Sequence, residues 1–184
     1  KALLLDEPLS ALDKKLREET QFELMDIQDK LGTTFIVVTH DQEEAMTLGT
    51  RIGVMDQGRL VQVDAPRDLY EYPKNRFIAD FVGSVNIFEG QVTEDESDHL
   101  RVGSAALGGE IYIDHGMSCQ LGQTVWVAVR PEKMRLRREP PEGPVGGAAQ
   151  GVVEDIAYMG GLSHYRVALP SGQRVRATLA NRDR

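Results

Sequence analysis

Two continuous apolar runs, separated by a segment with helical spacing, constrain the fold of this chain more than any other feature. The first run is Ala2 to Leu5 and the second is Thr34 to Thr39, and neither alternates apolar with polar residues. Such runs are typical of parallel strands that are buried on both faces. Between them, apolar positions from Asp13 to Leu31 recur near the helical period, and Gly32 follows as a stop signal. The order strand, helix, strand predicts an α/β layer on a parallel sheet.

The rest of the first 83 residues is also predicted to form short elements. Asp41, with Glu44 three residues later, resembles a capping box that opens a helix ending at Leu48. Two more elements are expected after it: a hairpin of residues 52–55 and 59–63 that turns at Gln57-Gly58, and a short helix opened by Pro66.

After about residue 83 the pattern changes to short β-rich runs with glycine at the turns. This change predicts a boundary between an α/β domain, residues 1–83, and an all-β domain, residues 84–184. Many short strands with glycine turns predict a small barrel or sandwich. The expected strands are 87–92, 99–102, 110–113, 124–129, 151–158, 164–169 and 174–179.

Composition excludes several classes of protein. No apolar run approaches the roughly 20 residues of a membrane-spanning helix, and the single cysteine, Cys119, cannot form an internal disulfide. The net charge of -8 argues against a protein that binds nucleic-acid phosphates. Aromatic residues make up 6% of the chain, which is few for the stacking platforms of a single-strand binder. We therefore expect no nucleic-acid partner, although a small barrel alone would permit one.

Charged side chains follow both predicted parallel strands. Asp6 and Glu7 end the first strand, and His40 follows the second. The carboxyl ends of parallel strands meet at one sheet edge, where open α/β folds bind ligands. Asp6 is suited to a magnesium ion and Glu7 to polarising an attacking water, and phosphoryl transfer needs mainly positioning and charge neutralisation. The sequence therefore predicts a phosphate-processing site at this edge.

These strings together resemble the ATP-binding cassette (ABC) transporter ATPases. Leu3 to Glu7 is similar to the Walker B strand, Ser10 to Asp13 to the D-loop, and His40 to the switch histidine. The resemblance implies that residues 1–83 are the C-terminal part of a P-loop NTPase sheet of the RecA type, with ATP and magnesium as cofactors. It implies catalytic roles for Glu7 and His40, magnesium binding by Asp6, and nucleotide contacts by Asp6, Ser10, Asp13 and His40.

The family's phosphate loop, Q-loop and signature are missing from the sequence. The string Leu169 to Arg174 imitates the signature but lies downstream of Walker B, so we expect it to be a hairpin turn. All the missing motifs precede Walker B in the family, and Lys1 leads directly into a strand pattern. We therefore expect a C-terminal fragment that begins at Walker B and is inactive as an ATPase by itself.

The β-rich half resembles the transport-associated OB-type (TOBE) domain of importer ATPases. The resemblance rests on the Arg130-Pro131-Glu132 corner and on Tyr158 to Gly161, and residues 85–90 favour the polyamine (spermidine/putrescine) type. It implies a peripheral subunit on the cytoplasmic face of the bacterial inner membrane. The implied partners are a second copy of the subunit, transmembrane permease subunits and, indirectly, a solute-binding protein.

Two other functions remain open at this point. The chain could be a non-catalytic module that acts through dimerisation and regulation by its β domain. It could also serve an importer for sugar, ferric ion or sulfate, because these importers share much of the same sequence pattern.

Overall fold

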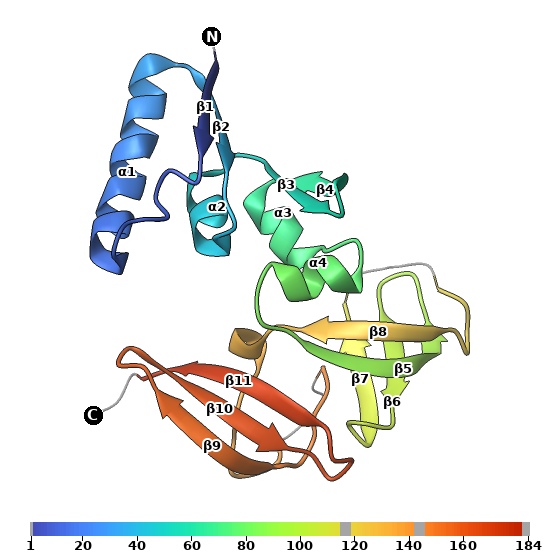
Figure 1. Ribbon diagram of the computed structural model, residues 1–184. Helices are drawn as coiled ribbons and strands as arrows, with labels where there is room; N and C mark the ends of the chain where they lie inside the picture. Colours follow the sequence, from blue (N-terminus) through green and yellow to red (C-terminus); the bar gives the residue numbers. More distant parts are fainter. Residues whose placement is uncertain (1, 115–118, 142–145, 182–184) are drawn as a thin grey trace. The chain divides into compact units, whose positions relative to one another are not determined.

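The structure of this protein is a computed structural model that describes residues 2–114, 119–141 and 146–181. It contains two compact units, with the boundary between Gly83 and Ser84 (Figure 1). Within the described ranges, no helix combines the length and the apolar character that crossing a membrane requires.

The first unit begins with two parallel strands joined by a long helix, as the sequence predicted. Strand β1 (Ala2–Asp6) pairs in parallel with β2 (Thr34–Val38), and helix α1 (Lys14–Leu31) connects them. The helix starts where the Asp13 carboxylate accepts a hydrogen bond from the Leu16 amide. It ends at Gly32, whose φ of 55° lies in the left-handed region that glycine tolerates.

Most of the remaining elements of this unit match their predictions, but the last helix, Arg76–Phe81, was not predicted from the sequence. Helix α2 (Gln42–Leu48) is followed by the antiparallel hairpin of β3 (Ile52–Asp56) and β4 (Arg59–Asp64), and then by helices α3 (Pro66–Glu71) and α4 (Arg76–Phe81). Both residues of the hairpin turn have positive φ, as the twist of a tight hairpin requires. A small apolar core joins the hairpin to the two last helices through Val54, Leu69, Ile78 and Val82.

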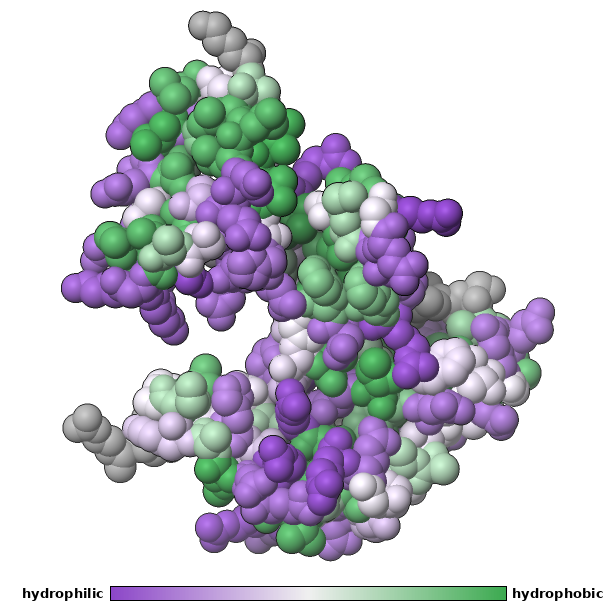
Figure 2. Space-filling model, viewed as in Figure 1, coloured by the Kyte–Doolittle hydropathy of each residue, from purple (hydrophilic) through white to green (hydrophobic). Residues whose placement is uncertain are grey.

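The prediction that the two parallel strands are buried on both faces is wrong for this chain. The side chains of Leu4 and Val38 are 73% and 58% exposed, and those of Leu3 and Ile36 are exposed as well. Figure 2 shows apolar surface, coloured green, on the first unit. Among the described residues β1 and β2 pair only with each other, and a sheet of two strands has too few neighbours to cover both of its faces.

In its described residues, the second unit is all β apart from one short 3-10 helix, Pro131–Lys133, at the predicted Arg-Pro-Glu corner. One sheet has the order β7-β6-β5-β8 and the other β11-β10-β9, and all their pairings are antiparallel. The seven predicted strands are confirmed. They are β5 (Asn86–Asp95), β6 (Leu100–Ser104), β7 (Gly109–Ile113), β8 (Thr124–Val129), β9 (Val152–Tyr158), β10 (Leu162–Ala168) and β11 (Arg174–Ala180).

The two sheets share one apolar core. Phe88 and Ile111 of the first sheet lie in the same buried cluster as Val167 and Val175 of the second. The signature-like string from Leu169 to Arg174 forms the turn between β10 and β11, where the Leu169 amide donates to the Gln173 carbonyl. The expected hairpin turn is thus confirmed.

Candidate active site

Candidate site residues gather where β1 and β2 end. The parallel register places Asp6 opposite Val38, so both strands finish at the same level of the sheet. The Glu7 amide donates to the Val38 carbonyl at 2.7 Å, which extends the pairing by one residue. Glu7 then adopts a φ of 44°, a left-handed conformation that costs a non-glycine residue roughly 1–2 kcal/mol. This backbone turn redirects the chain immediately after the strand.

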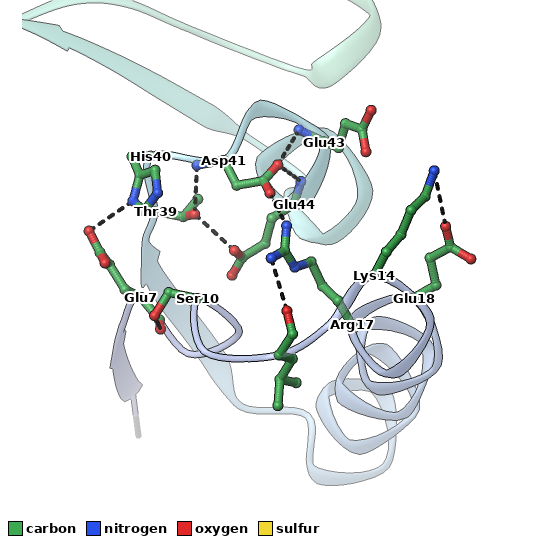
Figure 3. Close-up of polar contacts among 11 residues, drawn as sticks. Glu7, Ser10, Lys14, Arg17, Glu18, Thr39, His40, Asp41, Glu43 and Glu44 are labelled. Carbon is green, nitrogen blue, oxygen red and sulfur yellow. Dashed lines mark hydrogen bonds and ion pairs between the residues drawn. The ribbon is translucent and has the colours of Figure 1, made fainter. Parts of the chain in front are cut away.

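The side chains of Glu7 and His40 meet at this sheet edge. Oε1 of Glu7 lies 3.0 Å from Nδ1 of His40, and Figure 3 shows the two side chains pointing toward each other. The Glu7 and His40 side chains are 48% and 74% exposed, so a water molecule or a phosphate can reach both. The pair combines a proton acceptor with a ring that can donate or accept a hydrogen bond.

Asp6, the last residue of β1, offers a carboxylate but no complete metal site. Its side chain lies at the end of β1 and is exposed. Among the described residues, no three His, Cys, Asp or Glu side chains gather in a way that could enclose a metal ion. Magnesium is commonly held by one or two carboxylates together with substrate phosphates rather than by an all-protein cage. A lone exposed carboxylate at this edge therefore fits magnesium that arrives with a nucleotide.

Ser10 and Asp13 lie in the segment between β1 and α1 and contact backbone groups. The Ser10 hydroxyl donates to the Glu7 carbonyl at 3.0 Å. Oδ1 of Asp13 accepts from the Leu16 amide at 3.0 Å and so caps α1. Ser10 thus lies against the backbone of the site, whereas Asp13 forms the start of the helix. Both side chains are exposed.

A cluster of polar side chains that includes Arg17 and Thr39 lies next to His40 and was not predicted from the sequence. Arg17 contacts Asp41 through Nη1 and Oδ2 at 2.6 Å, and its Nη2 donates to the Leu12 carbonyl at 3.1 Å. The hydroxyl of Thr39 donates to Oε2 of Glu44 at 2.9 Å. Local sequence gave no signal for Arg17, because an arginine in the first turns of a helix is usually a solvated surface residue.

The predicted capping box at the start of α2 is confirmed in one half only. Oδ1 of Asp41 accepts hydrogen bonds from the amides of Glu43 and Glu44, as a capping residue does. The Asp41 amide, however, donates to the Thr39 hydroxyl, and the Glu44 carboxylate also uses that hydroxyl. In a capping box the Glu44 carboxylate would accept directly from the Asp41 amide, whereas here the Thr39 hydroxyl bridges these two groups.

The chain matches one family model. Residues 127–184 match the TOBE domain, a family with an OB-like fold. This match begins inside β8, of which it covers residues 127–129, and it includes the whole of the β11-β10-β9 sheet.

Curated relatives match the chain over nearly its whole length. It is 47% identical over 184 residues to the putrescine transport ATP-binding protein PotG of Escherichia coli (strain K12), covering 100% of this chain and 48% of the relative. It is 46% identical over 179 residues to the spermidine/putrescine import ATP-binding protein PotA of Chromobacterium violaceum, covering 97% of this chain and 49% of the relative.

A third relative is also a polyamine import ATP-binding protein, with lower sequence identity to this chain. The spermidine/putrescine import ATP-binding protein PotA of Pseudomonas aeruginosa (strain UCBPP-PA14) is 42% identical over 179 residues. The chain spans about half the length of the curated relatives it matches. Over its own length, the chain is therefore homologous to about half of each of these polyamine transport ATP-binding proteins, and its residues 127–184 match the TOBE domain.

Proposed function

We propose that this protein hydrolyses ATP to drive polyamine import, with Glu7 as the general base and His40 as a contact to the γ-phosphate. The observation that carries the proposal is the 3.0 Å contact between Glu7 and His40 at the carboxyl ends of two parallel strands. The names of the relatives, which are putrescine and spermidine/putrescine transport proteins, support the choice of solute.

Each site residue has a separate task in this proposal. The Glu7 carboxylate accepts the proton of the attacking water, and His40 holds the γ-phosphate on the same side. Asp6 holds magnesium, which neutralises charge on the phosphates when bound. Ser10 and Asp13 belong to a segment that approaches the nucleotide of a second copy of the subunit across a two-fold dimer.

The same proposal sets the expected partners and location. The unit of residues 1–83 is the C-terminal part of a P-loop NTPase domain, and the TOBE domain has a regulatory role. The subunit lies at the cytoplasmic face of the inner membrane against permease subunits that receive solute from a binding protein. Residues 1–184 contain no phosphate-loop motif, so we expect them to bind ATP only weakly by calorimetry when separated from the full-length subunit.

The experiment that tests the function is Glu7→Gln in the full-length subunit. Glutamine keeps the size of the side chain but cannot act as a base, so single-turnover hydrolysis is expected to fall by about 10²–10⁴ while equilibrium ATP binding persists. Asp6→Asn is expected to weaken both binding and hydrolysis. Glu18→Gln, which removes one exposed carboxylate from α1, is the matched control and should hydrolyse at the parental rate.

Two outcomes would redirect the proposal. Hydrolysis by Glu7→Gln at near the parental rate would exclude Glu7 as the base and favour the non-catalytic regulatory module. Uptake of a labelled sugar, ferric ion or sulfate in place of putrescine and spermidine, in cells that depend on this subunit, would keep the enzyme and change its solute.

A further inference from the structure

Arg17 joins two segments that flank the candidate active site. Its guanidinium contacts Oδ2 of Asp41 at 2.6 Å and donates to the carbonyl of Leu12 at 3.1 Å. Leu12 belongs to the segment between β1 and α1, and Asp41 directly follows His40. One side chain on α1 therefore connects the backbone that follows Glu7 with the backbone that carries His40 (Figure 3).

The surroundings of Arg17 make this connection stiffer than an ordinary surface ion pair. The side chains of Arg17 and Asp41 are 31% and 24% exposed, whereas those of the neighbouring pair Lys14 and Glu18 are 85% and 60% exposed and 3.9 Å apart. Ion pairs as exposed as Lys14–Glu18 contribute little to the stability of a protein. The other oxygen of Asp41 is held by the first amides of α2, so this carboxylate is fixed from both sides.

Arginine is better suited than lysine to make both contacts at once. Its planar fork presents two Nη groups in different directions, whereas the lysine ammonium is one compact point charge. In Arg17 one Nη group contacts the carboxylate and the other contacts the carbonyl. The Nε group is buried and has no hydrogen-bond partner among the described residues. The two Nη contacts therefore fix the guanidinium.

We propose that Arg17 is a positioning residue that holds His40 against Glu7 by tying Asp41 to the Leu12 carbonyl. The inference rests on the proposed function, since it assigns Arg17 a role in the same hydrolytic site. Arg17 touches neither the nucleotide nor the attacking water in this scheme. Its effect is on the distance and orientation of the two groups that do.

The kinetic test uses Arg17→Met and Arg17→Lys in the full-length subunit assembled with its permease. A displacement of about 1 Å can cost on the order of 100-fold in rate, so we expect Arg17→Met to lower kcat roughly 10- to 100-fold with KM for ATP within about threefold. The kcat of Arg17→Lys should lie between that of Arg17→Met and that of the parent. Lys15→Met, which removes a charge from an exposed pair on the same helix, should behave as the parent.

A double-mutant cycle tests the link to Asp41. Asp41→Asn keeps an oxygen to cap α2 but loses the charge that faces Arg17. If the two residues act as one unit, the double variant Arg17→Met/Asp41→Asn should lose no more activity than either single variant. Additive losses would show that Arg17 acts by another route and would overturn the proposal.

The spectroscopic test does not depend on turnover. The ¹⁵N shifts of the His40 ring report its tautomer and its hydrogen bond, and we expect them to change in Arg17→Met and in Asp41→Asn but not in Lys15→Met. Unchanged shifts would overturn the positioning role, even if the variant had lost activity.

Parallel assays of Glu7→Gln separate the two proposals. Parental kcat in the Arg17 variants, together with loss of hydrolysis in Glu7→Gln, would overturn only the role of Arg17. Parental hydrolysis by Glu7→Gln would overturn the proposed function, while the His40 spectrum would still decide whether Arg17 positions the ring.

Discussion

Oε1 of Glu7 and Nδ1 of His40 lie 3.0 Å apart although 33 positions separate them in the chain. The contact depends on the parallel register of β1 and β2, which brings the ends of the two strands to one level. Both side chains are substantially exposed. A pair in this position is suited to chemistry with solvent and phosphate and adds little to the stability of the fold.

We predict that replacing either member of this pair leaves stability nearly unchanged. Exposed ion pairs and hydrogen bonds of this kind contribute about 0.2–1 kcal/mol, so Glu7→Gln and His40→Ala should each alter the free energy of unfolding by less than about 1 kcal/mol. Urea unfolding monitored by circular dichroism measures this quantity. A loss of several kcal/mol would mean that the pair is structural and that reduced hydrolysis reports damage to the fold.

Thr39 is expected to matter more to stability than His40, its exposed neighbour. Its hydroxyl accepts from the Asp41 amide at 3.0 Å and donates to the buried carboxylate of Glu44, which is 2% exposed. Thr39→Val keeps the branched shape but leaves both groups without this partner, so we expect a destabilisation of about 1–3 kcal/mol. Thr39→Ser retains the hydroxyl and serves as the control in the same urea titration. Equal stability of the two variants would contradict this account.

Asn86 is predicted to be a strong determinant of stability in the second unit. Its side chain, 6% exposed, donates to the Arg176 carbonyl and accepts from the Arg176 amide, both at 2.8 Å. It therefore joins β5 of one sheet to β11 of the other. Asn86→Ala leaves the amide and the carbonyl of Arg176 without this partner and should cost about 1–3 kcal/mol in total.

The charge variant Asn86→Asp separates the two hydrogen bonds. It retains an acceptor for the Arg176 amide but cannot donate to the carbonyl while it is ionised. We expect hydrogen exchange at the Arg176 amide to be accelerated strongly in Asn86→Ala and less in Asn86→Asp. Equal acceleration in both would show that the side-chain acceptor is not what protects this amide.

The stability of the second unit is expected to depend on pH through His99. The hydrogen bond that the His99 ring donates to the Asp98 carboxylate raises the pKa of His99 above its usual 6.5, and Glu94 acts in the same direction. In turn, the hydrogen bond to His99 lowers the pKa of Asp98 below its usual 3.8. The ring also stacks on Tyr112 with centroids 5.1 Å apart.

The signs of the two shifts define a pH window. The contribution of His99 is complete below pH 6.5 and is lost as the pH rises through its higher folded-state pKa. The contribution of Asp98 is complete above pH 3.8 and is lost as the pH falls through its lower folded-state pKa. The stability difference between the parent and His99→Gln should therefore be largest between these values, and urea titrations across the range will measure it. A constant difference would refute the prediction.

Local signals in the sequence were sufficient for most of the secondary structure, although helix α4 was not predicted. Asp13 and Gly32 mark the ends of α1, and Gln57-Gly58 marks the hairpin, because capping and turn geometry depend on residues only a few positions apart. The strands of the second unit were also predictable from their apolar runs and glycine turns. The burial of the two parallel strands was not predictable in this way. The exposure of Leu4 and Val38 depends on what packs over the sheet rather than on the apolar sequence of the strands.

The sequence by itself determined the order of elements and the residue types at the sheet edge, including Asp6, Glu7 and His40. Tertiary structure decided that Glu7 touches His40, that Arg17 reaches both Asp41 and the Leu12 carbonyl, and that Asn86 pairs with Arg176 from 90 positions away. The physical reason is the separation along the chain between the residues that interact. Caps, turns and periodicity act between neighbours in the chain, whereas these contacts require strand register and side-chain packing between segments that only the complete fold brings together.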